Sequence, residues 1–266
     1  MSATRALVLA RGLGTRMRER TSADGPLDPA QAQAADAGVK AMIPFGRPFL
    51  DHVLHSLADA GIREVGLVLG PEHDAVRAYY RGLQARRVVI SFVTQPQPLG
   101  TADAVVCAEA WTGGHSFLVL NADNLYPVDV LARLARADGP AAPGFEAQSL
   151  ALPPARLGAF ALIEHDDQGC LSAIVEKPGE AAVAAAGPRA LISMNVWRFD
   201  ARIFDACRAV PVSARGEREL PQAVDLAVSR GLCLQVFPAR GPVLDLSWRD
   251  DIAEVARRLE GAEVRL

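Results

Sequence analysis

An alternation of short apolar runs with segments of helical spacing is the feature that most constrains the fold of this chain. Residues 6–10 form the first compact apolar run, and they lead directly into a glycine-containing loop. Such a run is typical of a parallel strand that is buried on both faces. Residues 49–60 then carry apolar side chains at helical spacing, and Gly61 follows as a C-terminal helix signal. The chain therefore begins as a strand, a loop and a helix.

The same alternation continues through the first half of the chain. We expect further strands at 64–69, 88–94 and 116–120, and further helices at 73–86 and 101–111. Strands that alternate with helices imply an α/β fold with a mainly parallel sheet and right-handed crossovers. Sheets of this kind bind ligands at the carboxyl ends of their strands. The glycine loop and the NADN stretch at 121–124 are therefore expected on one rim.

The second half is less regular. We expect strands at 159–164, 171–175, 191–199 and 232–238, a short helix at 180–187, and longer helices at 219–230 and 250–259. Asp250 and Asp251 are expected to cap the N-terminus of the last helix and to place negative charge there. Two segments, 21–38 and 139–155, are rich in small residues and proline, so both are predicted to be mobile surface loops.

The composition excludes several classes of protein. Of the 266 residues, 50% are hydrophobic and 22% charged, with a net charge of -3, which is unlike disordered or fibrous chains. The charge offers no general surface for nucleic acid, so no nucleic-acid partner is expected. No apolar run is long enough to cross a bilayer or to act as a signal peptide, so we expect a cytoplasmic protein with no membrane partner.

The four cysteines are Cys107, Cys170, Cys207 and Cys233. They are far apart in the sequence and form no C-x-x-C pair. This spacing predicts reduced core residues and disfavours both a metal cluster and a disulfide framework.

The first loop, LARGLGTRM, contains Gly12 and Gly14, but Met17 stands where a dinucleotide fingerprint requires a third glycine. The P-loop pattern fails as well, because no G-K-[ST] follows. Arg16 and Arg18 suit a ligand of higher charge than a dinucleotide pyrophosphate. A glycine turn after a first strand is common in α/β proteins, so this loop alone leaves the ligand open.

Seven motifs together point to a family. In chain order they are LARGLGTRM, VKAMIPFGRPFLDHVLHSLADAGIREV, TQPQPLGTADAV, LNADNLY, VEKP, SARGERELPQAV and VLDLSWRDD. From Leu7 to Ile252 the chain resembles the sugar-1-phosphate nucleotidyltransferases, the pyrophosphorylases that make nucleoside diphosphate sugars. The likeness is strongest to the glucose-1-phosphate thymidylyltransferase branch.

This resemblance implies a Rossmann-like, three-layer α/β/α fold with a mainly parallel mixed central sheet. It implies a single domain over 1–266, with a nucleotide-binding half at 1–125 and a sugar-phosphate-binding half at 126–266. The implied reaction joins a nucleoside triphosphate to a sugar 1-phosphate and releases pyrophosphate.

The chemistry of that reaction explains the absence of a catalytic triad. A phosphate monoester has its second pKa near about 6, so the attacking oxygen is already largely ionised at neutral pH. The protein then mainly positions the substrates and neutralises their charge. The five histidines are accordingly interpreted as ordinary surface or core residues.

The resemblance assigns the nucleotide site. The implied nucleotide-binding residues are Ala10, Gly12, Gly14, Thr15, Arg16, Gln95, Gly100 and Thr101. Backbone N–H groups of the loop would form an anion-binding nest, with Arg16 on the β- and γ-phosphates and Lys40 on the triphosphate. Gln95 and Gly100 would read the base. The chain departs from the family at Arg11, where a glycine is usual.

The resemblance also assigns a magnesium site and a sugar-phosphate site. Asp123 and Asp245 match the two Mg²⁺ ligands, and carboxylate oxygens suit a hard dication; Ser247 replaces an expected glycine nearby. The implied sugar-phosphate residues are Gly158, Glu176, Lys177, Asn195, Arg215 and Glu217. The implied catalytic residues are Arg16, Lys40, Asp123 and Lys177.

Three hypotheses follow. The first is a Mg²⁺-dependent sugar-1-phosphate nucleotidyltransferase. The second is a homologue that binds nucleotide sugars without catalysis, which predicts loss of Arg16, Lys40 or Asp123, yet all three are present. The third, a nicotinamide oxidoreductase, fails on the missing third glycine. The base, the sugar and the oligomeric state, whether monomer or homo-oligomer, stay open.

Overall fold

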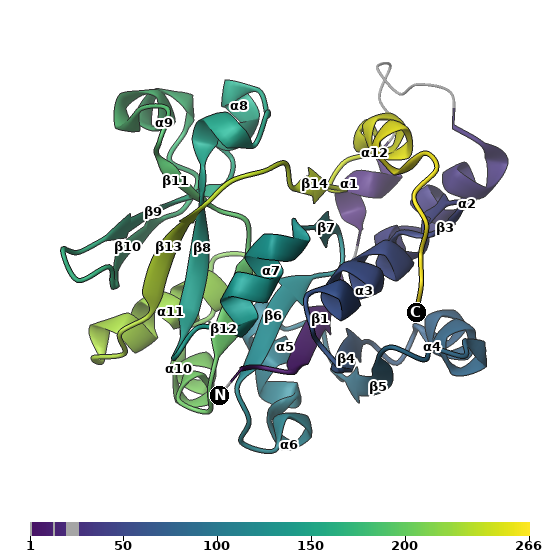
Figure 1. Ribbon diagram of the computed structural model, residues 1–266, viewed down its shortest axis with the longest axis horizontal. Coiled ribbons are helices and arrows are strands. Elements are labelled where there is room, and N and C mark those ends of the chain that lie inside the picture. Colours follow the sequence, from purple (N-terminus) through teal and green to yellow (C-terminus); the bar gives the residue numbers. More distant parts are fainter. Residues whose placement is uncertain (1, 13, 20–26) are drawn as a thin grey trace.

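A mixed ten-stranded sheet forms the middle of the molecule and is covered by helices on both faces (Figure 1). The computed structural model describes residues 2–12, 14–19 and 27–266. The strand order is β10-β9-β11-β8-β12-β6-β1-β4-β5, with β13 paired to β8. The three-layer α/β prediction is therefore confirmed.

The nucleotide-binding half expected from the sequence contains the parallel part of the sheet. Its strands are β1 (Arg5–Leu9), β4 (Glu64–Leu69), β5 (Val89–Thr94) and β6 (Phe117–Asn121), and every pairing among them is parallel. Ala6 and Val8 pack into the core on one face of the sheet, and Leu7 packs into the core on the other. Because β1 is covered on both faces, its sequence is a continuous apolar run.

Two groups of helices cover the two faces. The first core contains residues of α3 (Phe49–Asp59), α4 (Asp74–Gly82), α7 (Val128–Ala135) and α12 (Asp251–Leu259). The second core contains residues of α5 (Thr101–Cys107), α10 (Ile203–Ala209) and α11 (Leu220–Ser229). Short elements complete the first half: α1 (Thr15–Arg18), η1 (Lys40–Met42), β2 (Pro44–Phe45), β3 (Arg47–Pro48), α6 (Glu109–Thr112) and β7 (Asn124–Leu125).

The second half adds mostly antiparallel strands. They are β8 (Ala141–Glu146), β9 (Ala161–His165), β10 (Leu171–Val175), β11 (Leu191–Ser193), β12 (Val196–Phe199) and β13 (Gln235–Ala239). Around them lie η2 (Ala147–Ser149), α8 (Pro154–Leu157), α9 (Glu180–Ala186) and β14 (Leu244–Asp245). The single strand predicted at 191–199 is two strands, because Asn195 adopts a left-handed conformation with φ 56° and breaks the ladder.

The prediction of a surface loop at 139–155 is wrong for its first part. Residues 141–146 form β8, which is buried along its whole length and pairs with β11, β12 and β13. The proline and glycine of this segment suggested a loop, but Gly144 is required inside the sheet. A Cβ there would lie 2.8 Å from the Leu191 side chain, so the glycine permits a close approach of β11.

The loop predicted at 21–38 is also wrong in part. Residues 21–26 lie outside the described residues, but Pro29–Ala37 form helix α2. The Asp28 carboxylate accepts hydrogen bonds from the backbone N–H groups of Ala30 and Gln31, which caps the helix. Helix α2 packs against α1 and η1, the elements that carry Arg16 and Lys40.

The prediction that all cysteines are reduced is wrong for one pair. Cys170 and Cys233 form a disulfide across a sequence separation of 63 residues. Cys170 precedes β10, and an isolated bridge to Gln235 brings it beside the start of β13. Cys107 and Cys207 are free, as expected.

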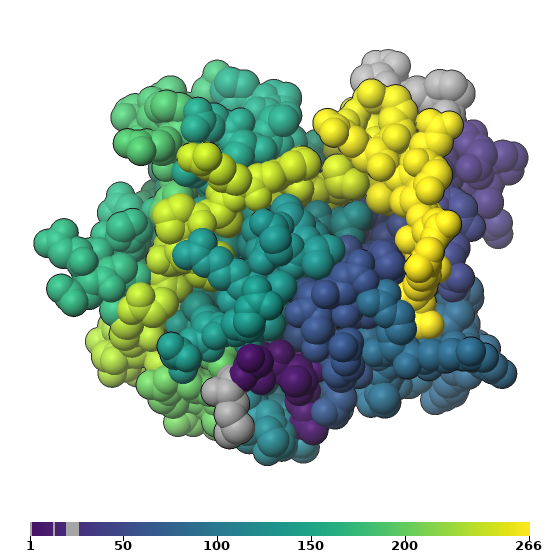
Figure 2. Space-filling model, in the orientation of Figure 1, coloured from purple at the N-terminus to yellow at the C-terminus, as the bar shows by residue number. Residues whose placement is uncertain are grey.

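The C-terminal segment lies over the outside of the first half. Figure 2 shows it, in yellow, running from α12 across the surface next to α3, and the Arg265 backbone N–H contacts Nδ1 of His55 at 3.2 Å. Among the described residues, no helix is long and apolar enough to span a membrane.

Candidate active site

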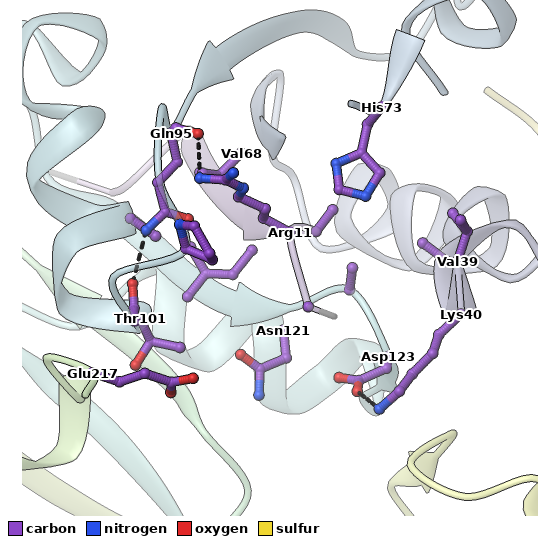
Figure 3. Close-up of a pocket in the computed structure, with 18 residues that line it drawn as sticks. Arg11, Val39, Lys40, Val68, His73, Gln95, Thr101, Asn121, Asp123 and Glu217 are labelled. Carbon is purple, nitrogen blue, oxygen red and sulfur yellow. Dashed lines mark hydrogen bonds and ion pairs between the residues drawn. The ribbon is translucent and has the colours of Figure 1, made fainter. Parts of the chain in front are cut away.

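A cleft opens at the carboxyl ends of the parallel strands, as expected for this sheet. Its cavity of about 240 Å³ is drawn in Figure 3. The lining side chains that the figure labels are Arg11, Val39, Lys40, Val68, His73, Gln95, Thr101, Asn121, Asp123 and Glu217. Residues that follow β1, β4, β5 and β6 thus meet in one place.

A second cavity adjoins the first. The two share Leu9, Thr101, Asn121 and Glu217 in their walls. The second is also lined by residues from the other half of the chain: Glu176, Asn195, Trp197, Arg215, Glu219, Leu220 and Pro221. The two cavities are therefore neighbours, and the shared residues form part of both walls.

The glycine loop lies at one end of this cleft. Gly14 has φ 61°, and a Cβ on it would overlap the carbonyl group of Gly38, so only glycine fits there. Ala10 and Gly12 line the first cavity. Leu13 lies outside the described residues, and the expected backbone nest is therefore not described as a whole.

Arg16 lies on α1 and is exposed. Its guanidinium is stacked over the indole ring of Trp248, 5.0 Å from the ring centre. Neither Arg16 nor Thr15 is among the residues that line the cavities. Arg18 donates to the Ala37 carbonyl at 3.0 Å, which links α1 to α2.

Lys40 and Asp123 meet inside the first cavity. The Lys40 ammonium donates to Oδ2 of Asp123 at 2.9 Å, and both side chains are about one-fifth exposed, at 19% and 23%. Lys40 comes from η1 and Asp123 from the turn after β6, so the contact joins segments far apart in the sequence (Figure 3).

Gln95 and Gly100 lie together in the wall of the first cavity. The Gln95 side chain is buried, and its Nε2 donates to the Gly100 carbonyl at 3.0 Å and to Asp103 at 2.8 Å. Both Nε2 hydrogens are thereby used, and Oε1 is the atom through which Gln95 can meet a base. The Thr101 hydroxyl accepts the Leu220 backbone N–H at 2.8 Å.

The chain matches the nucleotidyl transferase family model over residues 5–257. It belongs to this family. The glucose-1-phosphate thymidylyltransferase of Streptomyces antibioticus is 32% identical over 269 residues, covering 98% of this chain and 68% of that protein. The UTP–glucose-1-phosphate uridylyltransferase AglF of Haloferax volcanii is 28% identical, covering 96% of each chain.

Another relative of this nucleotidyl transferase is longer. It is the low-salt glycan biosynthesis nucleotidyltransferase Agl11 of Haloferax volcanii, 26% identical, and the alignment spans 93% of this chain and 64% of Agl11. A solved structure of UDP-glucose pyrophosphorylase complexed with UDP-glucose has the same fold, with a TM-score of 0.75, 17% identity, and coverage of 98% of this chain and 100% of that one.

Asp245 of the nucleotidyl transferase lies beside Asp123. Strands β7 and β14 pair, and the Leu246 N–H donates to the Asp123 carbonyl at 2.8 Å. The Asp245 carboxylate is buried and accepts from Asn124, Ser247 and Arg156. Burial raises the pKa of Asp245 above its usual value, and the nearby charge of Asp123 raises it further.

Asp123 and Asp245 offer carboxylate oxygens, the donors that a hard divalent cation prefers. The described residues contain no cluster of three or more metal-ligating side chains, so substrate phosphates and water would have to complete the coordination sphere. Asp123, in the turn before β7, and Asp245, at the end of β14, would be the protein ligands of such an ion.

Asp250 occupies the N-cap position of α12 and Asp251 lies in its first turn, so both place negative charge at the helix N-terminus as expected. The Asp250 side chain makes no capping hydrogen bond. The Asp251 carboxylate accepts from the N–H groups of Ser247 and Trp248, which precede the helix, and it pairs with Arg156.

Four of the six expected sugar-phosphate residues line the second cavity: Glu176, Asn195, Arg215 and Glu217. Burial, and then the charge of Glu219, raise the pKa of Glu176. Arg215 makes a two-contact ion pair with Glu219, at 3.1 and 2.8 Å. Gly158 and Lys177 are not among the lining residues. Gly158 accepts the Gly179 N–H at 3.1 Å instead, and Lys177 is exposed after β10.

The sequence analysis gave no role to His73 or to Asn121, although Asn121 belongs to the NADN stretch expected on this rim. His73 lies after β4, accepts the Gly70 N–H on Nδ1 at 3.1 Å, and turns its ring into the cavity (Figure 3). Burial lowers the pKa of His73, so the neutral imidazole is favoured. Asn121 ends β6 and lines both cavities. Their position after parallel strands was the one signal that could have identified them.

Proposed function

We propose that this nucleotidyl transferase moves a nucleoside monophosphate from a nucleoside triphosphate to a sugar 1-phosphate, giving a nucleoside diphosphate sugar and pyrophosphate. The observation that carries the proposal is the Lys40–Asp123 pair within a cleft formed by two adjoining cavities. The named activities of the Streptomyces and AglF relatives support it. No observation favours a non-catalytic homologue.

In this proposal the two halves of the chain bind different substrates. Residues 1–125 hold the nucleotide, with Gln95 Oε1 accepting from the base and Gly100 at its edge. Residues 126–266 hold the sugar phosphate, with Glu176, Asn195 and Glu217 next to the sugar hydroxyls. Arg215 is already held in a fork by Glu219 and can turn toward the phosphate.

Neutralisation of charge is the main contribution to catalysis. The Lys40 ammonium leaves Asp123 and binds the triphosphate. Arg16, which is exposed on α1, binds the departing pyrophosphate. Lys177 contacts the sugar phosphate. The nucleophile is an ionised phosphate oxygen, so the chain supplies no general base. Reactants held in line by fixed cations need little reorganisation during transfer.

Asp123 and Asp245 are the residues that would hold a magnesium ion. When bound, the ion would act as a Lewis acid on the phosphate oxygens. Asp245 is fixed for this role by hydrogen bonds from Asn124 and Ser247, so Ser247 supports the carboxylate although a glycine was expected there.

The test is release of pyrophosphate by the purified protein across a panel of nucleoside triphosphates and sugar 1-phosphates with Mg²⁺. We expect turnover with at least one pair, and we expect Asp123→Asn to lower kcat by about a hundredfold or more, as removal of one preorganised electrostatic group does. Asp205→Asn, on the exposed surface of α10, is the matched control and should keep full activity. The proposal fails if the wild type shows no turnover, or if Asp123→Asn equals it.

A further inference from the structure

Arg156 links α8 to the segment that carries Asp245. It belongs to α8, two residues before Gly158, and its side chain reaches β14 and the start of α12. Nη2 of Arg156 donates to Oδ2 of Asp245 at 2.6 Å. Nothing in the sequence motifs assigned a role to this arginine.

The same guanidinium makes a stronger attachment to Asp251. Nη1 donates to Oδ1 of Asp251 at 2.5 Å, and Nη2 donates to Oδ2 at 2.9 Å. This parallel two-bond arrangement is the favoured geometry of an arginine–carboxylate pair. Asp251 is itself held by the N–H groups of Ser247 and Trp248. Arg156 can therefore release Asp245 and still keep its fork on Asp251.

Both proposed metal ligands already have a cationic partner. Lys40 pairs with Asp123, and Arg156 pairs with Asp245. The Asp245 side chain is only 4% exposed, so its charge would be costly to bury without a cation. A divalent ion between the two carboxylates would repel both basic groups, and each has another partner: the triphosphate for Lys40, and Asp251 for Arg156.

We propose that Arg156 is a positioning residue that serves as the counter-ion of Asp245 and yields Oδ2 of that carboxylate to a divalent cation, retreating onto Asp251. The inference rests on the proposed function, because it takes Asp123 and Asp245 as the cation ligands. Arg156 thereby sets the affinity of the site for the ion, and it links that affinity to α8, in the half proposed to hold the sugar phosphate.

The test measures Mn²⁺ binding by electron paramagnetic resonance, with the whole protein and no nucleotide, so that turnover is not the readout. Arg156→Gln should tighten Mn²⁺ binding about tenfold, because it removes a competing charge within hydrogen-bond distance of the carboxylate. Asp251→Asn should weaken it several-fold, because Arg156 then has Asp245 as its remaining charged partner. Arg240→Gln removes a similar arginine–carboxylate pair, with Glu146 elsewhere on the surface, and should change nothing.

A double mutant separates this exchange from a simple charge effect. If Asp251 acts through Arg156, then Asp251→Asn changes Mn²⁺ binding less than twofold in the Arg156→Gln background. Additive effects of the two changes would overturn the proposal, since independent charges add. Arg156→Lys keeps the charge but not the fork. The Mn²⁺ affinity of this variant should lie between the affinities of the wild type and of Arg156→Gln. If Arg156→Gln does not fold, Arg156→Lys takes its place in the test.

One more variant distinguishes this proposal from the proposed function. Asp245→Asn should abolish the Mn²⁺ site. If it leaves Mn²⁺ binding intact, the metal assignment is wrong and the role of Arg156 fails with it. If Asp245→Asn weakens binding but Arg156→Gln does not tighten it, only the inference about Arg156 is overturned.

Discussion

Arg11 stands where the resemblance to the family implies a glycine, and the structure places it in the wall of the first cavity. The side chain is 8% exposed and pairs with Glu72 at 3.2 Å. It donates to the backbone carbonyl of Gln95 (Figure 3) and to that of Pro96. It thereby ties the end of β1 to the segments after β4 and β5. Arg11 therefore holds in place the segment that carries Gln95, the proposed contact to the base.

Arg11→Met should therefore raise the KM for the nucleoside triphosphate by about tenfold and leave the KM for the sugar 1-phosphate unchanged. The reason is the loss of hydrogen bonds from a charged donor, each of which contributes about 1.5–3 kcal/mol. Steady-state kinetics with each substrate varied in turn measures the difference. Arg133→Met is the control, since Arg133 also donates to a backbone carbonyl, that of Pro238, but outside the cleft. Equal changes in both KM values would contradict the role given to Arg11.

At the scale of elements, the edge of the second half is held by a covalent link as well as by hydrogen bonds. Strand β10 pairs with β9 alone in the sheet order, and the register shifts between Leu171 and Ala173. The Cys170–Cys233 disulfide joins the start of β10 to the segment before β13. Glu176 and Lys177 follow directly from β10, so the link supports the strand that leads to these expected sugar-phosphate residues.

Cys233→Ser should lower the free energy of unfolding by about 2–4 kcal/mol, because the disulfide closes a loop of 63 residues and so restricts the unfolded chain. Denaturant unfolding of the oxidised wild type and the variant measures it, and reduction should bring the wild type to the same value. Cys107→Ser, at a free cysteine, should not show this dependence on reductant. If reductant leaves the free energy of unfolding of the wild type unchanged, the stabilising role of the disulfide is contradicted.

At the scale of the whole molecule, two cores on opposite faces of one sheet stabilise the fold, and the first contains a buried histidine. His52 on α3 is 4% exposed, and its Nε2 contacts the Phe45 carbonyl at 3.2 Å. Burial lowers the pKa of His52 below its usual value. The imidazole is therefore neutral in the folded protein, and the unfolded chain binds the proton more readily.

The consequence is a loss of stability with acid. The contribution of His52 is fully present above the unfolded pKa of about 6.5 and is lost as the pH falls below it, with a slope of up to about 1.4 kcal/mol per pH unit. In His52→Gln the free energy of unfolding should fall less steeply between pH 7 and pH 5 than it does in the wild type, by part of that slope. Chemical denaturation at several pH values measures it, with exposed His165→Gln as the control. Parallel curves for wild type and His52→Gln would refute this account.

The sequence by itself determined the parallel half of the sheet and the identity of the family. Strands buried on both faces have to be apolar throughout, so β1, β4 and β6 were visible as local runs, and β4 was predicted with its observed bounds at 64–69. The rule that such sheets bind ligands at the carboxyl ends of their strands placed the glycine loop and the NADN stretch on one rim, and Gly12 and Asp123 line the same cavity. These features depend on neighbours in the sequence or on a general property of such sheets.

Only the tertiary structure decided which distant segments meet. Strand β8 was missed because it contains proline and glycine, which usually indicate a loop. The neighbouring strands that make these residues acceptable, β13 and β11, come from distant parts of the sequence. The Cys170–Cys233 link, the contacts made by Arg11 and the exchange position of Arg156 between Asp245 and Asp251 all join residues far apart in the chain. Contacts of this kind are set by the packing of whole elements, and no pattern within a short window of sequence encodes them.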